Sequence, residues 1–173
     1  MELVLDDKLV TAVAERYGER TVVKLRTLPN RLPWSREVTA TVTVVGRWPD
    51  QEQLVDLTHY GKCWPEQLLV WLNLKQNTGK DLLAAAVHEL RHLWQYHCHR
   101  EFLTRRAVTK DPVVAYWMKP CEVDARRAEW CYRYRLPQPK TINSDWPIGR
   151  TEFELRELTD PLTDWWIKQQ LFG

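Results

Sequence analysis

The sequence lacks the features of several large classes of protein. Its longest uninterrupted apolar run, residues 82–87, is far shorter than the roughly 20 residues that a helix needs to cross a bilayer. Residues 1–10 are acidic and have too little apolar length for a signal peptide. No phosphate-binding glycine loop, serine nucleophile elbow or internal repeat is present. We therefore expect a cytoplasmic protein with no membrane partner.

Cysteine is scarce and the net charge is small. The four cysteines have no C-x-x-C spacing, which favours reduced thiols over disulfides or a cysteine zinc site. The formal charge is only +2, although basic residues gather in two clusters: Arg100, Arg105, Arg106 and Lys110, then Arg126, Arg127, Arg133 and Arg135. Such clusters are usually solvated faces, and the ten tryptophans do not interleave with them. Contact with nucleic acid is therefore the less favoured interpretation.

The chain does contain one segment with a specific chemical pattern, HELRH at residues 88–92. Residues 82–86 are good helix formers, and no Gly or Pro occurs between residues 80 and 110, so we expect a helix capped by Thr78 or Asp81. Residues four apart on a helix lie one turn above each other.

On such a helix the imidazoles of His88 and His92 leave from the same face and can share one tetrahedral zinc ion. Glu89, one position after the first histidine, can take a proton from a water bound to that ion. The alternative is a surface helix rich in His and Glu with no metal. A continuous apolar stripe argues against it, because it predicts a buried helix: Leu83, Ala86, Val87, Leu90, Leu93 and Trp94. Gln95 and His99 extend a polar strip beside that stripe, and buried polar groups need partners.

The third ligand must come from elsewhere, because catalytic zinc usually has three protein ligands and a water. His97 and His99 cannot reach the pair without breaking the helix. Pro120 is placed to begin a second helix, with Glu122 in its first turn. A small residue, Ala125, on the same face lets this helix approach closely. Glu122 is therefore the predicted ligand, with Asp124 the weaker choice and Cys121 interpreted as a packed thiol.

HELRH followed about thirty residues later by E-V-D-A resembles the gluzincins, zinc peptidases whose ligands are two His and one Glu. The apolar segment at residues 68–74 is similar to the strand before the active helix in SprT-like and IrrE-like proteins. SprT-like enzymes use a third His, which this chain does not offer, so the gluzincin comparison is closer. The resemblance covers residues 68–136 and implies that substrate binds as an extra strand along the sheet edge beside the metal.

The chain departs from the gluzincin pattern at one position. Many gluzincins carry an Asp four residues after the ligand Glu, where it orients a zinc-bound His, but here that position is Arg126. We expect another residue, for which Glu129 is the candidate, to orient the histidine instead.

We predict an α+β, zincin-like fold of residues 1–136 with a small mixed or antiparallel sheet of three to four strands, followed by an extension at residues 137–173. The expected order is an N-terminal helix at 5–17 ending at Gly18, strands at 21–28, 38–46, 54–60 and 68–74, the active helix and a backing helix. The last strand is the most apolar and is expected to be central; 38–46 and 54–60 are the candidate edges. A final helix after residue 159 is expected either to pack on the domain or to cover the site as an inhibitory tail.

The predicted function is hydrolysis of peptide bonds in a peptide or protein substrate, with Zn2+ held by His88, His92 and Glu122 and with Glu89 as general base. Tyr116, Tyr132 and His97 are the candidates for stabilising the oxyanion. Two alternatives remain: a regulatory or binding protein with weak or no hydrolysis, suggested by Arg126, and a protease that finds DNA through its arginine clusters.

Overall fold

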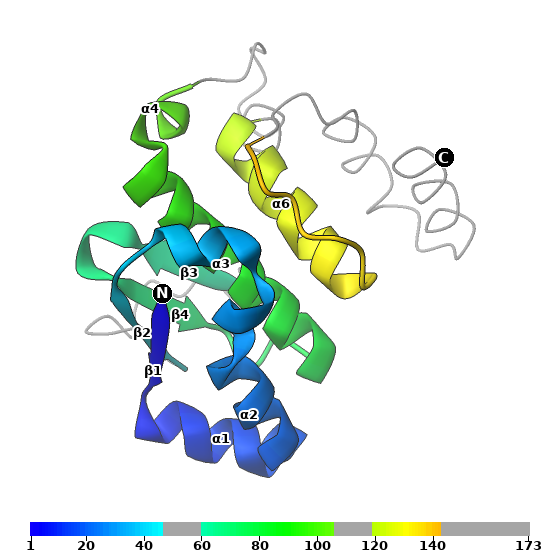
Figure 1. Ribbon diagram of the computed structural model, residues 1–173. Coiled ribbons are helices and arrows are strands. Elements are labelled where there is room, and N and C mark those ends of the chain that lie inside the picture. The colour runs from blue at the N-terminus through cyan, green and yellow to red at the C-terminus, as the bar shows by residue number, and fades with distance from the viewer. Residues whose placement is uncertain (47–59, 106–118, 143–173) are drawn as a thin grey trace.

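The computed structural model describes residues 1–46, 60–105 and 119–142 (Figure 1). These residues form an α+β fold with one small sheet and helices packed against it. The elements in chain order are β1 (Glu2–Leu5), α1 (Asp7–Tyr17), α2 (Glu19–Arg26), β2 (Thr41–Val45), β3 (Gly61–Trp64), β4 (Leu69–Leu72), α3 (Gly79–Cys98), α4 (Arg100–Leu103) and α6 (Pro120–Arg133). Short 3-10 turns lie at Leu28–Arg31, Pro33–Glu37 and Pro65–Gln67.

The sheet has the strand order β1-β2-β4-β3 and is mixed. β1, β2 and β4 run parallel, whereas β3 is antiparallel to β4, with Cys63 opposite Val70. The apolar strand β4 is interior, as predicted. β2 is interior too, which rules out residues 38–46 as the edge; the other candidate, residues 54–60, lies outside the described residues up to residue 59. The alternation of β2 places Val42 and Val44 in the core, and a parallel strand lies on each side of it.

The N-terminal third contains the predicted first helix, α1, but differs from expectation at α2 and β1. Residues 21–28, predicted as a strand from their β-branched content, lie in α2 and the 3-10 turn that follows. Helical spacing decides this, because Val22 and Leu25 face the core three residues apart. Gly18, at φ 84°, separates α1 from α2 in a conformation that favours glycine, and it ends α1 as predicted. Residues 2–5 form β1, a strand too short to be recognised from its alternation alone.

The N-terminus of α1 is set by its cap. Asp6 accepts hydrogen bonds from the backbone N–H groups of Lys8 and Leu9 at 3.0 and 3.2 Å. These bonds satisfy donors that have no partner inside the helix. The helix therefore begins at Asp7 rather than at residue 5, and the preceding residues are free to join the sheet.

Helices α3 and α6 lie side by side (Figure 1) and position the candidate site. The predicted apolar stripe of α3 is buried, and α6 begins at Pro120 as expected. Ala125 and Ala128 on α6 are fully buried. Because neither side chain extends beyond Cβ, the two helix backbones can approach closely.

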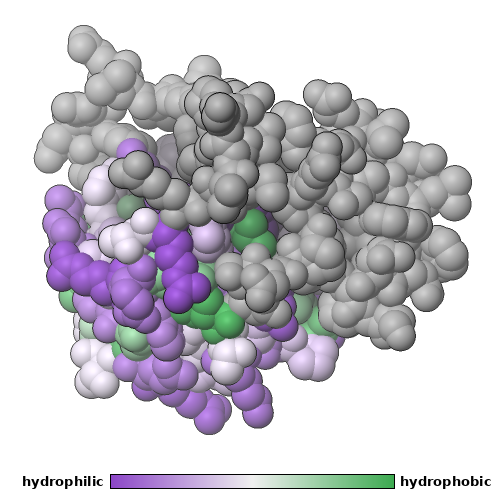
Figure 2. Space-filling view, turned by 90° about the horizontal axis from the view of Figure 1, so that it is seen from above, coloured by the Kyte–Doolittle hydropathy of each residue, from purple (hydrophilic) through white to green (hydrophobic). Residues whose placement is uncertain are grey.

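Several predictions lie outside the described residues, among them the strand at 54–60 up to residue 59 and the final helix after residue 159. The boundary at residue 136 stays a prediction. Within the described part, Gln138 donates to the carbonyl oxygen of Ala128 at 3.1 Å, so the chain just after α6 contacts that helix. None of the described helices is long and apolar enough to span a membrane. Seen from above, the described surface is mainly hydrophilic with smaller hydrophobic areas (Figure 2).

Candidate metal centre

Three donor groups from two helices converge between α3 and α6. His88 and His92, one turn apart on α3, have their Nε2 atoms 3.1 Å from each other. Glu122, in the first turn of α6, places Oε2 3.3 Å from Nε2 of His88 and Oε1 3.4 Å from Nε2 of His92. The structure thus brings the three predicted ligands together, and one donor atom from each lies within 4.8 Å of the others.

These separations fit a tetrahedral cation. Donors bound to zinc at about 2.0–2.2 Å in a tetrahedron are roughly 3.3–3.6 Å apart. The two Nε2 atoms are 3.1 Å apart and lie 3.3 and 3.4 Å from different oxygens of Glu122, and with one donor atom per residue the three atoms lie within 4.8 Å of one another. Two imidazole nitrogens and one carboxylate oxygen are also a known donor set for catalytic zinc, and they leave a fourth position open. The residues therefore fit the ion in chemistry, and each contact among them is close to the separation of donors in such a site.

The electrostatics of the metal-free site show strong coupling between the same groups. Burial lowers the pKa of His88, but its hydrogen bonds to Glu122 and Glu129 outweigh burial and raise that pKa to about 10. Burial alone raises the pKa of Glu122, yet the imidazoles of His92 and His88 beside it hold it far below its ordinary value. A metal ion binds the neutral imidazole, so binding of a cation here would release the proton that His88 holds at neutral pH.

Nδ1 of His88, the ring nitrogen that does not face His92 and Glu122, also has a hydrogen-bond partner. This nitrogen lies 3.2 Å from Oε2 of Glu129, and the other oxygen of Glu129 accepts from Arg133 at 2.9 Å. Arg133 in turn contacts Asp81 at the start of α3. Glu129 thus takes the orienting position predicted for it in place of an acid at residue 126. Arg126 itself is buried in α6.

Glu89 lies buried between α3 and β3. Burial raises the pKa of its carboxyl group, whereas the imidazoles of His88 and His92 oppose that rise. The side chain lies directly against Gly61 of β3: a Cβ built on that glycine would stand 2.9 Å from Cγ and 3.2 Å from Oε1 of Glu89. Sequence reasoning missed Gly61, because β3 has neither length nor alternation to mark it as a strand.

The other candidate ligands point elsewhere. His97 makes its hydrogen bond to the carbonyl oxygen of Pro65, at 3.3 Å. His99 packs its ring on Trp94, with centroids 4.5 Å apart. Asp124 is fully buried against Arg91. Among the described residues these side chains are not part of the converging group.

The two thiols nearest the site have the character of packed cysteines. Burial, and then the charge of Glu122, raises the pKa of Cys121 to about 11. Burial, and then Glu89, also raises the pKa of Cys63 on β3. Both thiols therefore keep their protons at neutral pH, as expected of packed cysteines.

The three candidates for oxyanion stabilisation have different surroundings. Tyr116 lies outside the described residues. Tyr132 packs partly buried against the core, and burial raises its pKa. His97 is exposed, and its Nε2 is hydrogen-bonded to the carbonyl oxygen of Pro65.

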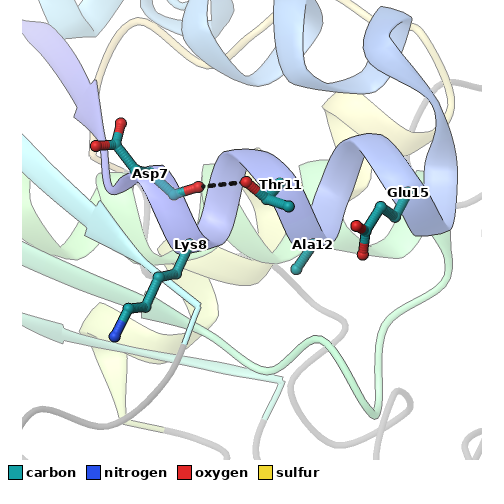
Figure 3. A pocket seen from close by; sticks show the side chains of 5 residues that line it. All are labelled: Asp7, Lys8, Thr11, Ala12 and Glu15. Carbon is teal, nitrogen blue, oxygen red and sulfur yellow. Dashed lines mark hydrogen bonds between the residues drawn. The ribbon is translucent and has the colours of Figure 1, made fainter.

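A shallow pocket elsewhere on the surface follows a single helix, α1 (Figure 3). It is lined by Asp7, Lys8, Thr11, Ala12 and Glu15 and contains none of the converging residues. Its hydroxyl group, on Thr11, bonds within the helix to the carbonyl oxygen of Asp7. We assign no function to it.

No protein-family model, curated protein or solved structure matches this chain.

Proposed function

We propose that this chain is a zinc-dependent metallopeptidase of the gluzincin type, with a zincin-like fold and a place in the cytoplasm. His88, His92 and Glu122 would hold the ion, and Glu89 would act as general base. One observation carries the proposal: two imidazole nitrogens and a carboxylate, from helices far apart in sequence, converge at 3.1–3.4 Å beside a buried glutamate.

Zinc, when bound, supplies a Lewis acid that acidifies a water molecule and polarises the substrate carbonyl. Glu89 accepts the proton of the attacking water and then delivers it to the nitrogen of the leaving amine. Burial raises the pKa of Glu89, and general acid–base catalysis favours a carboxyl group whose pKa is raised in this way. Glu129 would hold the ring of His88 in place during these steps, and Arg133 in turn holds Glu129.

The position of β3 supports a peptide or protein substrate. β3 is the terminal strand of the described sheet, and its Gly61 lies against Glu89 of α3. An extended peptide lying along this strand would form backbone hydrogen bonds and present its carbonyl groups to the base. Such binding depends little on side chains, so we expect a broad sequence preference.

The first alternative loses the observation that suggested it, and the second loses part of its support. A non-hydrolytic binding protein was suggested by Arg126 in place of an orienting acid, but Glu129 contacts His88 instead. A DNA-associated protease was suggested by the arginine clusters. In the second cluster Arg126 is buried and Arg133 is paired with Asp81 and Glu129, so neither belongs to a free basic face.

The proposal is tested by metal analysis and peptide hydrolysis on the same preparation. We expect one zinc per chain, cleavage of a peptide library, and loss of cleavage on adding a chelator. Glu89→Gln should keep the zinc and abolish cleavage, whereas Glu101→Gln, a matched change at an exposed position on α4, should alter neither. Absence of zinc, or full cleavage by the Glu89 variant, would refute the proposal.

A further inference from the structure

A buried chain of hydrogen bonds runs behind the second histidine. Nδ1 of His92 lies 2.9 Å from Oε1 of Gln95, one turn further along α3. The amide nitrogen of Gln95 donates to Oδ2 of Asp124 at 2.8 Å and to the carbonyl oxygen of Cys121 at 3.0 Å. Arg91 donates from Nε to that same Oδ2 at 2.7 Å, and from Nη2 to Oδ1 at 3.0 Å. Gln95, Asp124 and Arg91 are all fully buried.

Arg91, at the end of this hydrogen-bond network opposite His92, fixes the direction of every hydrogen bond in it. A guanidinium can only donate, so Asp124 must accept from Arg91 as a carboxylate. Both groups facing the amide of Gln95 on that side, Asp124 and the carbonyl of Cys121, are therefore acceptors. The amide must turn its NH2 toward them and its oxygen toward His92. Because an amide oxygen cannot donate, Nδ1 of His92 must carry the hydrogen.

The other nitrogen of His92 is the one that faces the site. With the hydrogen held on Nδ1, Nε2 is available as a lone pair, which is the form that binds a metal ion. On the inner side, Nε2 of His92 is 3.1 Å from Nε2 of His88 and 3.4 Å from Oε1 of Glu122, the two groups that would share the ion with it.

Arg91, at the end of this hydrogen-bond network, has contacts on several sides. Cζ of Arg91 lies over the rings of both Trp34 and Trp94, 5.1 and 3.9 Å from their centroids. Its remaining donors reach the carbonyl oxygens of Pro139 and Thr141, at 3.2 and 3.0 Å. A buried ion pair held in this way cannot reorient cheaply, because breaking it leaves a charge without a partner.

We propose that Gln95 is a positioning residue of the metal centre, which holds His92 with hydrogen on Nδ1 and Nε2 directed at the ion, and which is itself oriented by Asp124 and Arg91. This inference rests on the metal-binding part of the proposed function and not on hydrolysis. It assigns a role to Arg91, which the metal-binding pattern within HELRH leaves unassigned, and to a residue three positions beyond that motif.

The first test is the hydrogen position on His92, read by long-range 1H–15N correlation of the metal-free protein labelled with 15N-histidine. We expect hydrogen on Nδ1. A bare Nδ1 overturns the inference, whether or not the protein binds zinc or cleaves peptides, so this measurement separates its failure from failure of the proposed function.

The second test is zinc affinity, measured by competition with a chromophoric chelator. Gln95→Met keeps the length of the side chain but removes the acceptor, and we expect an affinity loss of roughly 10- to 100-fold together with loss of the Nδ1 hydrogen signal. The matched control is Tyr96→Phe, which removes an exposed hydrogen bond to Glu66 at the next position of α3 and should change neither quantity. Wild-type affinity in Gln95→Met, or an equal loss in the control, overturns the inference. If Gln95→Met does not fold, the measurement on the wild-type protein decides it.

Discussion

Replacing Gly61 with alanine should displace the proposed catalytic base without touching the metal ligands. The new Cβ would lie 2.9 Å from Cγ of Glu89 and 3.1 Å from the carbonyl oxygen of Trp71. Carbon atoms in contact prefer about 3.5–4.0 Å, so the side chain of Glu89 must move by roughly 0.6 Å or more. Displacements of about 1 Å in an active site can cost on the order of 100-fold in rate, and we expect a loss of roughly 10- to 100-fold in kcat.

The same substitution has two opposing effects on stability. Alanine reduces the freedom of the unfolded chain, which stabilises the protein by roughly 0.4–1 kcal/mol. Overpacking against Glu89 and Trp71 costs about 1–3 kcal/mol. We therefore expect a net loss of roughly 1–2 kcal/mol in the free energy of unfolding.

The assay is steady-state cleavage of a library-derived peptide, with zinc content and unfolding by urea measured on the same samples. Gly79→Ala is the matched control, because its Cβ would meet Tyr17 at 3.6 Å, an ordinary contact at the first residue of α3. The control should retain both activity and zinc, with unchanged or slightly higher stability. A Gly61→Ala variant that keeps wild-type kcat would show that the approach of β3 does not position Glu89.

Three further predictions concern the ligands and their surroundings. Glu122→Ala should greatly weaken zinc binding, and full occupancy at wild-type affinity would remove Glu122 from the ligand set. Glu129→Gln should weaken it less, by roughly 10- to 100-fold, in the same chelator competition; an unchanged affinity would mean that its contact with His88 does not orient the ring. In the metal-free protein, the raised pKa of His88 stabilises the fold fully below the ordinary value of 6.5, and this contribution is lost as pH rises toward about 10. The loss is at most about 1.4 kcal/mol per pH unit, seen as the difference in urea unfolding between wild type and His88→Asn, and a difference independent of pH would contradict it.

Local patterns in the sequence determined the parts of the fold that depend on neighbours along the chain. Helix formers and an unbroken apolar stripe predicted α3, and the four-residue spacing within that helix predicted that His88 and His92 share one face. Pro120 and the small Ala125 predicted the start of α6 and its close approach, which places Glu122 at the two rings. Each of these signals lies within a few residues of the feature that it predicts.

The same kind of signal failed where two periodicities competed. Residues 21–28 are rich in β-branched side chains, yet Val22 and Leu25 enter the core at helical spacing and the segment is mainly α2. β1 and β3 are four residues each, too short for alternation to be distinguished from chance. For this reason β3, the strand at the described edge of the sheet, was not among the candidate edges.

Only the tertiary structure decided what surrounds the candidate ligands. Glu129 reaches His88 across 41 positions of sequence, and Asp124 reaches Arg91 across 33. Gly61 meets Glu89 because a strand packs on a helix. No local spacing encodes such contacts, since they depend on the distance and rotation between whole elements, which the packing of the complete core sets. The sequence alone therefore determined which groups could bind a cation, and the packed fold decided how each of them is oriented and held.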